Sequence, residues 1–82
     1  MKMKMKDVVK LREFPYHKTY SACLVWYKED NKYHLVDVDF IERTGKQFIV
    51  HDDWMTPTYS YINAVNFYEQ FVEDFKRTYN CD

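Results

Sequence analysis

The sequence predicts an α+β fold, in which an antiparallel meander of three or four strands carries one long C-terminal helix on one face. The first observation is an apolar repeat at steps of three and four residues after Tyr61, which is typical of an amphipathic helix. The second is a set of three upstream segments rich in branched and aromatic residues, separated by short polar turns. With 82 residues, 20% of them aromatic, the chain is expected to form a single small domain.

Residues 1–15 are predicted to form a basic N-terminal edge strand or arm. Met and Lys alternate over residues 1–6, so an extended chain would place Lys on one side and Met on the other. Regularly spaced Lys is a common protection of an exposed sheet edge. A short helix over residues 5–14 is the alternative, and Pro15 ends the segment in either case.

The meander is predicted over residues 19–52. Its strands cover residues 19–27, 33–41 and 47–52. Residues 28–32 form the first turn, and residues 43–46, which contain the single Gly of the chain, form the second.

We expect a register that pairs Tyr27 with Tyr33 and Arg43 with Gln47. One face of the sheet is then almost wholly apolar and lies beneath the helix: Tyr20, Ala22, Leu24, Trp26, His34, Val36, Val38, Phe40, Phe48 and Val50. A slip by one residue would bring Asp37 to this face, at the cost of burying a carboxylate.

The C-terminal helix is predicted over residues 57–79. Thr56 would be its N-cap with Pro57 in the first turn, or Thr58 would cap a helix that opens at Tyr59. The apolar stripe that we expect to form the core comprises Tyr61, Ala64, Val65, Tyr68, Phe71, Val72, Phe75 and Tyr79. Ile62 and Phe67 flank this stripe on its two sides, where they extend the core or form a second contact point.

The outer face of the predicted sheet is acidic and aromatic, and we expect it to bind a partner protein. Its candidate contact residues are Asp37, Asp39, His51, Asp53, Tyr27, Tyr33 and Leu35. Tyr is enriched in interfaces because it combines a large ring with a polar tip. The carboxylates favour a basic partner, such as an enzyme that binds nucleic acid.

A metal-dependent hydrolase is an alternative interpretation of the same face. Asp37, Asp39, His51 and Asp53 offer the oxygen and imidazole ligands that divalent cations take. A flat outer face supplies neither a pocket nor supporting groups around the ligands. One Gly also excludes a glycine-rich phosphate loop, so we expect no enzyme activity, catalytic residue, metal or cofactor.

A nucleic-acid-binding module is the other alternative. Residues 1–28 hold seven Lys or Arg against two acids, whereas residues 29–82 hold five against eleven. The layout of three antiparallel strands and a helix is similar to arm-type DNA-binding domains of phage integrases and to double-stranded RNA-binding domains. Those domains bind phosphates through Lys and Arg, and here the candidates are Lys2, Lys4, Lys6, Lys10 and Arg12.

Composition also suggests a source and a compartment. Lys, Asn, Tyr, Phe and Met are plentiful, which is typical of AT-rich coding in a low-GC bacterium or its phages. Two cysteines and no apolar secretory segment favour free thiols in the cytoplasm of a bacterial host cell. We therefore expect a small inhibitor or regulator from a phage or mobile element, an antagonist of host defence that occupies a host protein's surface. Self-association is left open.

Overall fold

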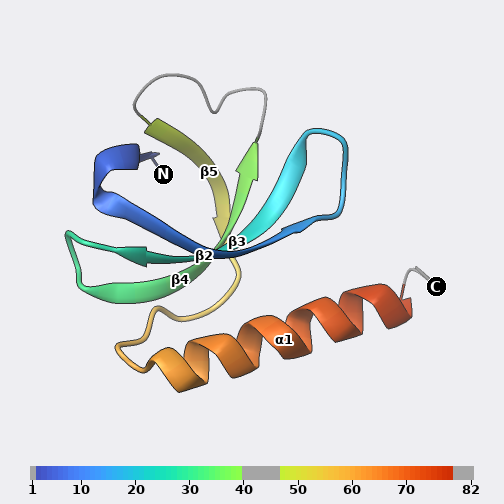
Figure 1. The fold of residues 1–82 in the computed structure, drawn as a ribbon. Helices are drawn as coiled ribbons and strands as arrows, with labels where there is room; N and C mark the ends of the chain where they lie inside the picture. The colour runs from blue at the N-terminus through green and yellow to red at the C-terminus, as the bar shows by residue number, and fades with distance from the viewer. Residues whose placement is uncertain (1, 40–46, 79–82) are drawn as a thin grey trace.

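The computed structural model describes residues 2–39 and 47–78, and gives only the backbone of residues 2, 5, 39, 47–49 and 51. Its elements are β1 (Lys2–Lys4), the 3-10 helix η1 (Met5–Asp7), β2 (Val8–Pro15), β3 (Tyr20–Tyr27), β4 (Lys32–Asp39), β5 (Gln47–Asp53) and α1 (Tyr61–Thr78). The predicted α+β class is confirmed, because β2 to β5 form an antiparallel meander and α1 packs on it (Figure 1).

The N-terminal segment contributes two strands rather than one. The order of strands across the sheet is β1-β5-β4-β3-β2, so β1 and β2 lie at its two opposite edges. Both pair antiparallel, β1 with β5 and β2 with β3. Met and Lys side chains lie on opposite sides of β1, as expected, since Met3 is buried and Lys4 is exposed.

The short connection between β1 and β2 requires the sheet to curl. In a flat sheet of five strands the two edges would lie about 19 Å apart, at about 4.8 Å per strand. Only the three residues of η1 join the edges, and a 3-10 helix advances by about 2 Å per residue. The edges must therefore approach each other, which gives the strongly curved sheet of Figure 1.

The curl creates two cores, one on each side of the sheet. The inner face encloses Met3, Cys23, Val25, Val36, Val38 and Val50. On the opposite side, which we call the helix face, Ala22, Leu24, Leu35 and Met55 form a buried cluster with Ala64 of α1. As a result, five successive residues of β3, from Ser21 to Val25, are buried. Such a run is expected of a strand covered on both sides.

The predicted register between β3 and β4 is wrong by one residue. The structure pairs Tyr27 with Lys32 and Trp26 with Tyr33. The turn is one residue shorter than predicted because Asn31 adopts a left-handed conformation, with φ of 57°. Its backbone N–H donates to the carbonyl of Tyr27 at 2.9 Å. Asn tolerates this conformation better than most residues, because its short polar side chain bonds locally.

The slip exchanges the faces of β4. Val36 and Val38, which were expected beneath the helix, lie on the inner face, and Leu35 takes their place under α1. The prediction that burial costs would keep Asp37 off this face was wrong, because it assumed that only one face of the sheet is buried. The curl buries apolar residues on both faces. Asp37 does reach the helix face, but it is only half-buried there and is hydrogen-bonded. The second predicted turn, residues 43–46, lies outside the described residues, as do residues 40 and 41.

The helix begins at Tyr61, four residues later than predicted. Thr58 cannot join it, because its N–H and C=O both pair with the backbone of Tyr33, at 3.2 and 2.7 Å. Ser60 is the N-cap instead of Thr56 or Thr58, since its Oγ accepts the N–H of Asn63 at 3.2 Å. Tyr79, the predicted last residue, lies outside the described residues.

The sequence predicts that the whole apolar stripe of α1 is part of the core, but only some of its residues are buried. Val65, Tyr68 and Phe71 pack against the helix-face core, as expected. Ala64 is buried, but Tyr61 is 45% exposed. Most buried volume is therefore supplied by the sheet, and the helix covers one side of it incompletely.

Replacing Met3 with Ala is expected to reduce the free energy of unfolding by about 2–5 kcal/mol, because it leaves a cavity in the inner core. The neighbouring control, Lys4→Ala, changes an exposed side chain and should cost less than about 0.5 kcal/mol. Urea denaturation measures both. Equal effects would contradict the placement of β1 in the sheet.

Replacing Ser60 with Ala is expected to destabilise the protein by about 1 kcal/mol, through loss of the helix cap. Thr56→Ala removes the cap that the sequence suggested, from an exposed position, and should change stability by less than about 0.5 kcal/mol. Thermal denaturation compares them. A larger loss from the Thr56 variant would show that the helix starts earlier.

Candidate functional site

The acidic-aromatic face expected from the sequence is divided between the two sides of the sheet. Tyr27 and Asp53 belong to the inner face, whereas Tyr33, Leu35 and Asp37 belong to the helix face. Leu35 is fully buried and cannot contact a partner. The side chains of Asp39 and His51 lie outside the described residues. The β3–β4 register shift separates Tyr27 from Tyr33, Leu35 and Asp37. A second shift, between Asp37 and Val38 in the β4–β5 pairing, places Asp53 opposite Val36 on the inner face.

Asp53 is engaged with a buried histidine. The side chain of His34 is almost fully enclosed, and its Nδ1 lies 2.8 Å from Oδ2 of Asp53. Its Nε2 lies 2.7 Å from Oδ2 of Asp30, in the turn before β4. The edge of the Tyr27 ring packs against the imidazole, with centroids 6.0 Å apart. This His34 cluster ties the β3–β4 turn to the end of β5.

The two carboxylates determine the protonation of His34. Burial by itself lowers the pKa of the imidazole, but the hydrogen bonds and negative charges of Asp53 and Asp30 outweigh it, so the pKa is raised above 6.5. With both ring nitrogens beside carboxylate oxygens, the protonated ring donates two hydrogen bonds. No ring nitrogen is left to accept a proton from a substrate or to bind a metal.

Asp37 is also engaged inside the molecule. It accepts a hydrogen bond of 2.5 Å from the hydroxyl of Tyr16, whose pKa is raised by burial and by this carboxylate. The Tyr16 ring packs on Trp54 and Phe75, with centroid distances of 5.8 and 5.2 Å. This aromatic cluster holds the chain after β2 over the helix face. The role of Asp37 is thus structural.

Exposed and half-buried aromatic and aliphatic side chains gather instead at the start of α1. We call the set Val9, Trp26, Tyr33, Tyr59, Tyr61 and Ile62 the aromatic surface. Val9 pairs with Trp26 across β2 and β3, and Trp26 pairs with Tyr33 across β3 and β4. The rings of Tyr33 and Tyr61 meet edge to face at 5.6 Å. Four separate elements and the β5–α1 connection therefore contribute to one surface.

Several of these side chains are largely open to solvent. Ile62 is 69% exposed, Tyr59 is 68% exposed and Val9 is 49% exposed. Sequence reasoning assigned Tyr61 to the core and placed Trp26 beneath the helix, so it missed this surface. The sequence contained one indication of this surface, because Ile62 is an apolar residue that lies beside the apolar stripe of the helix and not in it.

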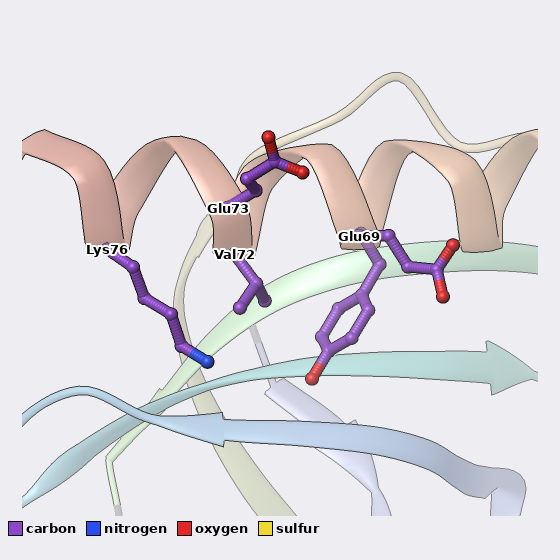
Figure 2. A pocket seen from close by; sticks show the side chains of 5 residues that line it. Glu69, Val72, Glu73 and Lys76 are labelled. Atoms are coloured by element: carbon purple, nitrogen blue, oxygen red, sulfur yellow. The ribbon is translucent and has the colours of Figure 1, made fainter. Parts of the chain in front are cut away.

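A shallow pocket continues along the same side of α1 and opens widely to solvent. It has a volume of about 440 Å³ and is lined by Tyr68, Glu69, Val72, Glu73 and Lys76. Figure 2 shows Val72 and Lys76 directed toward the sheet and Glu73 pointing away from it, while the side chain of Glu69 extends sideways from the helix. The lining thus combines apolar surface with two carboxylates and the ammonium group of Lys76.

The basic N-terminal residues belong to the sheet and do not form a separate arm. Residues 2–15 make β1, η1 and β2. Lys10 is bonded to Glu13 at 2.6 Å along β2. Removing residues 1–12 would therefore remove sheet structure as well as positive charge.

Within residues 2–39 and 47–78, no group of three or more His, Cys, Asp and Glu side chains is placed to hold a metal ion. In the same part of the chain, no helix has the length and apolar character needed to cross a membrane. Comparisons of the chain with family models, curated proteins and solved structures gave no match. The function of the protein must therefore be inferred from the arrangement of its side chains.

The stability of the protein is expected to fall as the pH rises above neutrality. A raised pKa in the folded state means that protonated His34 stabilises the fold fully below its unfolded-state pKa of about 6.5. That stabilisation is lost as the pH rises through the folded-state value. Urea denaturation from about pH 6 to about pH 9 measures the slope, and the NMR titration of the His34 ring gives its pKa directly.

His34→Gln should flatten this pH dependence, whereas His17→Gln should preserve it. His17 is exposed and contacts Thr19 through Nδ1, so it serves as the matched control. An NMR titration of His34 with a midpoint below 6.5 would contradict the assignment, even if the His34 variant does not fold.

Proposed function

We propose that this protein is a non-enzymatic domain that binds a partner protein through the aromatic surface. The observation that carries the proposal is the convergence of apolar side chains from β2, β3, β4, the β5–α1 connection and α1, of which Trp26 and Tyr33 are half-buried and the other four are exposed. Contiguous apolar patches on small proteins are commonly contact sites. Trp and Tyr are also the side chains that most often dominate binding energy at interfaces.

The aromatic surface is held in place before any partner arrives. The indole Nε1 of Trp26 donates to Oδ1 of Asn31 at 3.1 Å. Tyr33 is fixed by its two backbone hydrogen bonds to Thr58, and Lys32 lies over the Tyr59 ring with Nζ 5.0 Å from the centroid. Side chains that are already ordered lose less conformational entropy on binding. This arrangement supports recognition of a folded or extended protein segment.

The proposal moves the contact away from the carboxylates that the sequence indicated. Asp37 bonds Tyr16, and Asp53 bonds His34, so both are used within the fold. Tyr33 remains from the original set of candidate residues. A non-catalytic role is supported by His34, because both of its ring nitrogens are occupied by carboxylates.

We extend the proposal to an inhibitor or regulator that works in the cytoplasm of a bacterial host. The residue usage typical of AT-rich coding, as in a low-GC bacterium or its phages, supports this source. With only two cysteines, the chain lacks the disulfide-rich pattern of small secreted domains, which suits a reducing compartment. A small domain with a preformed aromatic surface can act by occupying the surface of a larger enzyme.

Replacing Ile62 with Asp is expected to abolish capture of the partner without unfolding the protein, because Ile62 is mostly exposed. The measurement is affinity capture from a bacterial lysate, followed by determination of the affinity of the captured protein for each purified variant. Placing a charge within an apolar contact should weaken binding by about 100-fold.

The control is Phe67→Asp, which places the same charge at another exposed apolar position of α1. Phe67 is 43% exposed and lies on the other side of the helix stripe. Binding should survive in this variant. Loss of binding only in the Phe67 variant, or in neither variant, would overturn the proposal.

A further inference from the structure

We propose that the His34 cluster is a pH-dependent switch, which orders the aromatic surface while His34 is protonated and loosens it when the proton is lost. This inference rests on the proposed function, because it adds the regulation of the same surface. Two features of the structure support it. Hydrogen bonds join His34 to Trp26 through the β3–β4 turn, and two carboxylates both depend on the protonated ring.

The β3–β4 turn, residues 28–31, connects His34 with the aromatic surface. Oδ2 of Asp30 lies 2.7 Å from Nε2 of His34, and Oδ1 of the same carboxylate accepts the backbone N–H of Lys32 at 3.0 Å. The next residue, Asn31, is left-handed, and its Oδ1 accepts the indole N–H of Trp26 at 3.1 Å. The conformation of the turn therefore determines the position of the Trp26 ring.

Other rings of the aromatic surface also lie next to this turn. Nζ of Lys32 is 5.0 Å from the centroid of the Tyr59 ring. Tyr33 follows directly in the chain, and its ring meets Tyr61 edge to face at 5.6 Å. A displacement of the turn would therefore disturb the aromatic surface at several rings.

Only a protonated imidazole can bond both carboxylates of the cluster. In the protonated ring each nitrogen donates an N–H, one to Asp30 and the other to Asp53. The neutral ring has a single N–H, so its second nitrogen would point a lone pair at a carboxylate oxygen. At the 2.7 and 2.8 Å of these contacts, two acceptors repel each other. Loss of the proton therefore opens one of the two contacts.

The contact with Asp30 is the one that opens. Oδ1 of Asp53 is buried and has no hydrogen-bond partner among the described residues, so this carboxylate depends on the bond from His34. Asp53 also lies in β5, whereas Asp30 lies in a turn and is the more exposed, with 36% of its side chain open to solvent against 25%. The neutral ring thus keeps its N–H toward Asp53, and Asp30 turns to water. The backbone N–H of Lys32 then loses its acceptor, and the turn no longer holds Trp26 in one position.

Three titratable groups face His34 among the residues that the structure describes, from the turn, β5 and β3: Asp30, Asp53 and Tyr27. The hydroxyl of Tyr27 donates to Glu29 at 2.8 Å. This hydrogen bond, burial and the charges of Glu29, Asp7 of η1 and Asp30 raise the pKa of Tyr27 to about 12, so its ring stays neutral. Titration of the cluster near neutral pH is therefore that of His34.

The aromatic surface is ordered on the acidic side of this titration. Burial lowers the pKa of His34, but the two carboxylates raise it by more, so the transition lies above about pH 6.5. Below the transition both hydrogen bonds of the ring are present, and above it the turn is released. Binding through the aromatic surface should accordingly weaken as the pH rises.

The test uses two-dimensional NMR of the full chain without a partner, from about pH 6 to about pH 9. The chain has two Trp residues, so the indole N–H of Trp54, whose ring stacks on Phe71 at 4.7 Å, is an internal control. The Trp26 indole signal should shift with the midpoint of the His34 ring, and its heteronuclear NOE should fall above that midpoint. A Trp26 signal that ignores the titration of His34, or a Trp54 signal that changes equally, would overturn the inference.

Asn31→Gly tests the path through the turn. Gly adopts the left-handed conformation without strain but removes the side-chain acceptor of the Trp26 indole. His34 should titrate with its midpoint unchanged, whereas the Trp26 signal should no longer follow it. A Trp26 signal that still follows His34 in this variant would contradict the proposed path.

Asp30→Asn tests the carboxylate. The amide can bond the ring in either protonation state, since it offers both an acceptor and a donor. The midpoint of His34 should fall, because one negative charge is removed, and Trp26 should stop following it. Glu69→Gln, which removes a charge from an exposed position of α1, is the control and should change neither signal. Equal behaviour of the two variants would overturn the role of Asp30.

The regulation of binding is measured separately with the captured partner. Its affinity should be about threefold to tenfold weaker at about pH 9 than at about pH 6, because a side chain that is no longer ordered must be immobilised on binding. Asn31→Gly should remove most of this difference. Equal affinity of the unmodified chain at both pH values would overturn the regulation. Because the Trp26 measurements need no partner, retention of the partner by Ile62→Asp overturns only the proposed function, and an unresponsive Trp26 overturns only the switch.

Discussion

The short η1 connection is the constraint on which the rest of the structure depends. It joins strands at opposite edges of the sheet, so the sheet must curl until those edges approach each other. The curl gives a chain of 82 residues two buried faces instead of one. A small domain gains most from such an arrangement, because it has little other means of removing apolar surface from water.

The curl also determines which polar side chains are enclosed and therefore need hydrogen-bond partners inside the protein. On the inner face His34 is compatible with burial only because Asp30 and Asp53 bond both of its ring nitrogens. On the helix face Asp37 is bonded by Tyr16. Carboxylates that would form a solvated strand face in a flat sheet thus become internal partners. The surface that we propose as the contact site is mainly aromatic and aliphatic.

The sheet supplies most of the buried side chains, and this leaves apolar side chains exposed at the start of α1, where we propose that a partner binds. Both cores are built around β3 and β4, and α1 buries Ala64 while leaving Tyr61 and Ile62 exposed. A helix that supplied the whole core would have no such side chains to offer. Its incomplete cover leaves the aromatic surface and the adjoining pocket on one side of α1.

The sequence by itself determined the fold class, the segments that form the meander and the helix, and the placement of Met and Lys on opposite sides of the N-terminal strand, because these follow from local periodicity. It did not determine the register, because a single left-handed residue, Asn31, shortens a turn and reverses the faces of β4. The register also divides the candidate contact residues between the two faces of the sheet, and Tyr33 is the one that lies in the aromatic surface. Only the tertiary structure decided which carboxylates are paired and which aromatic rings meet, since both depend on contacts between distant segments.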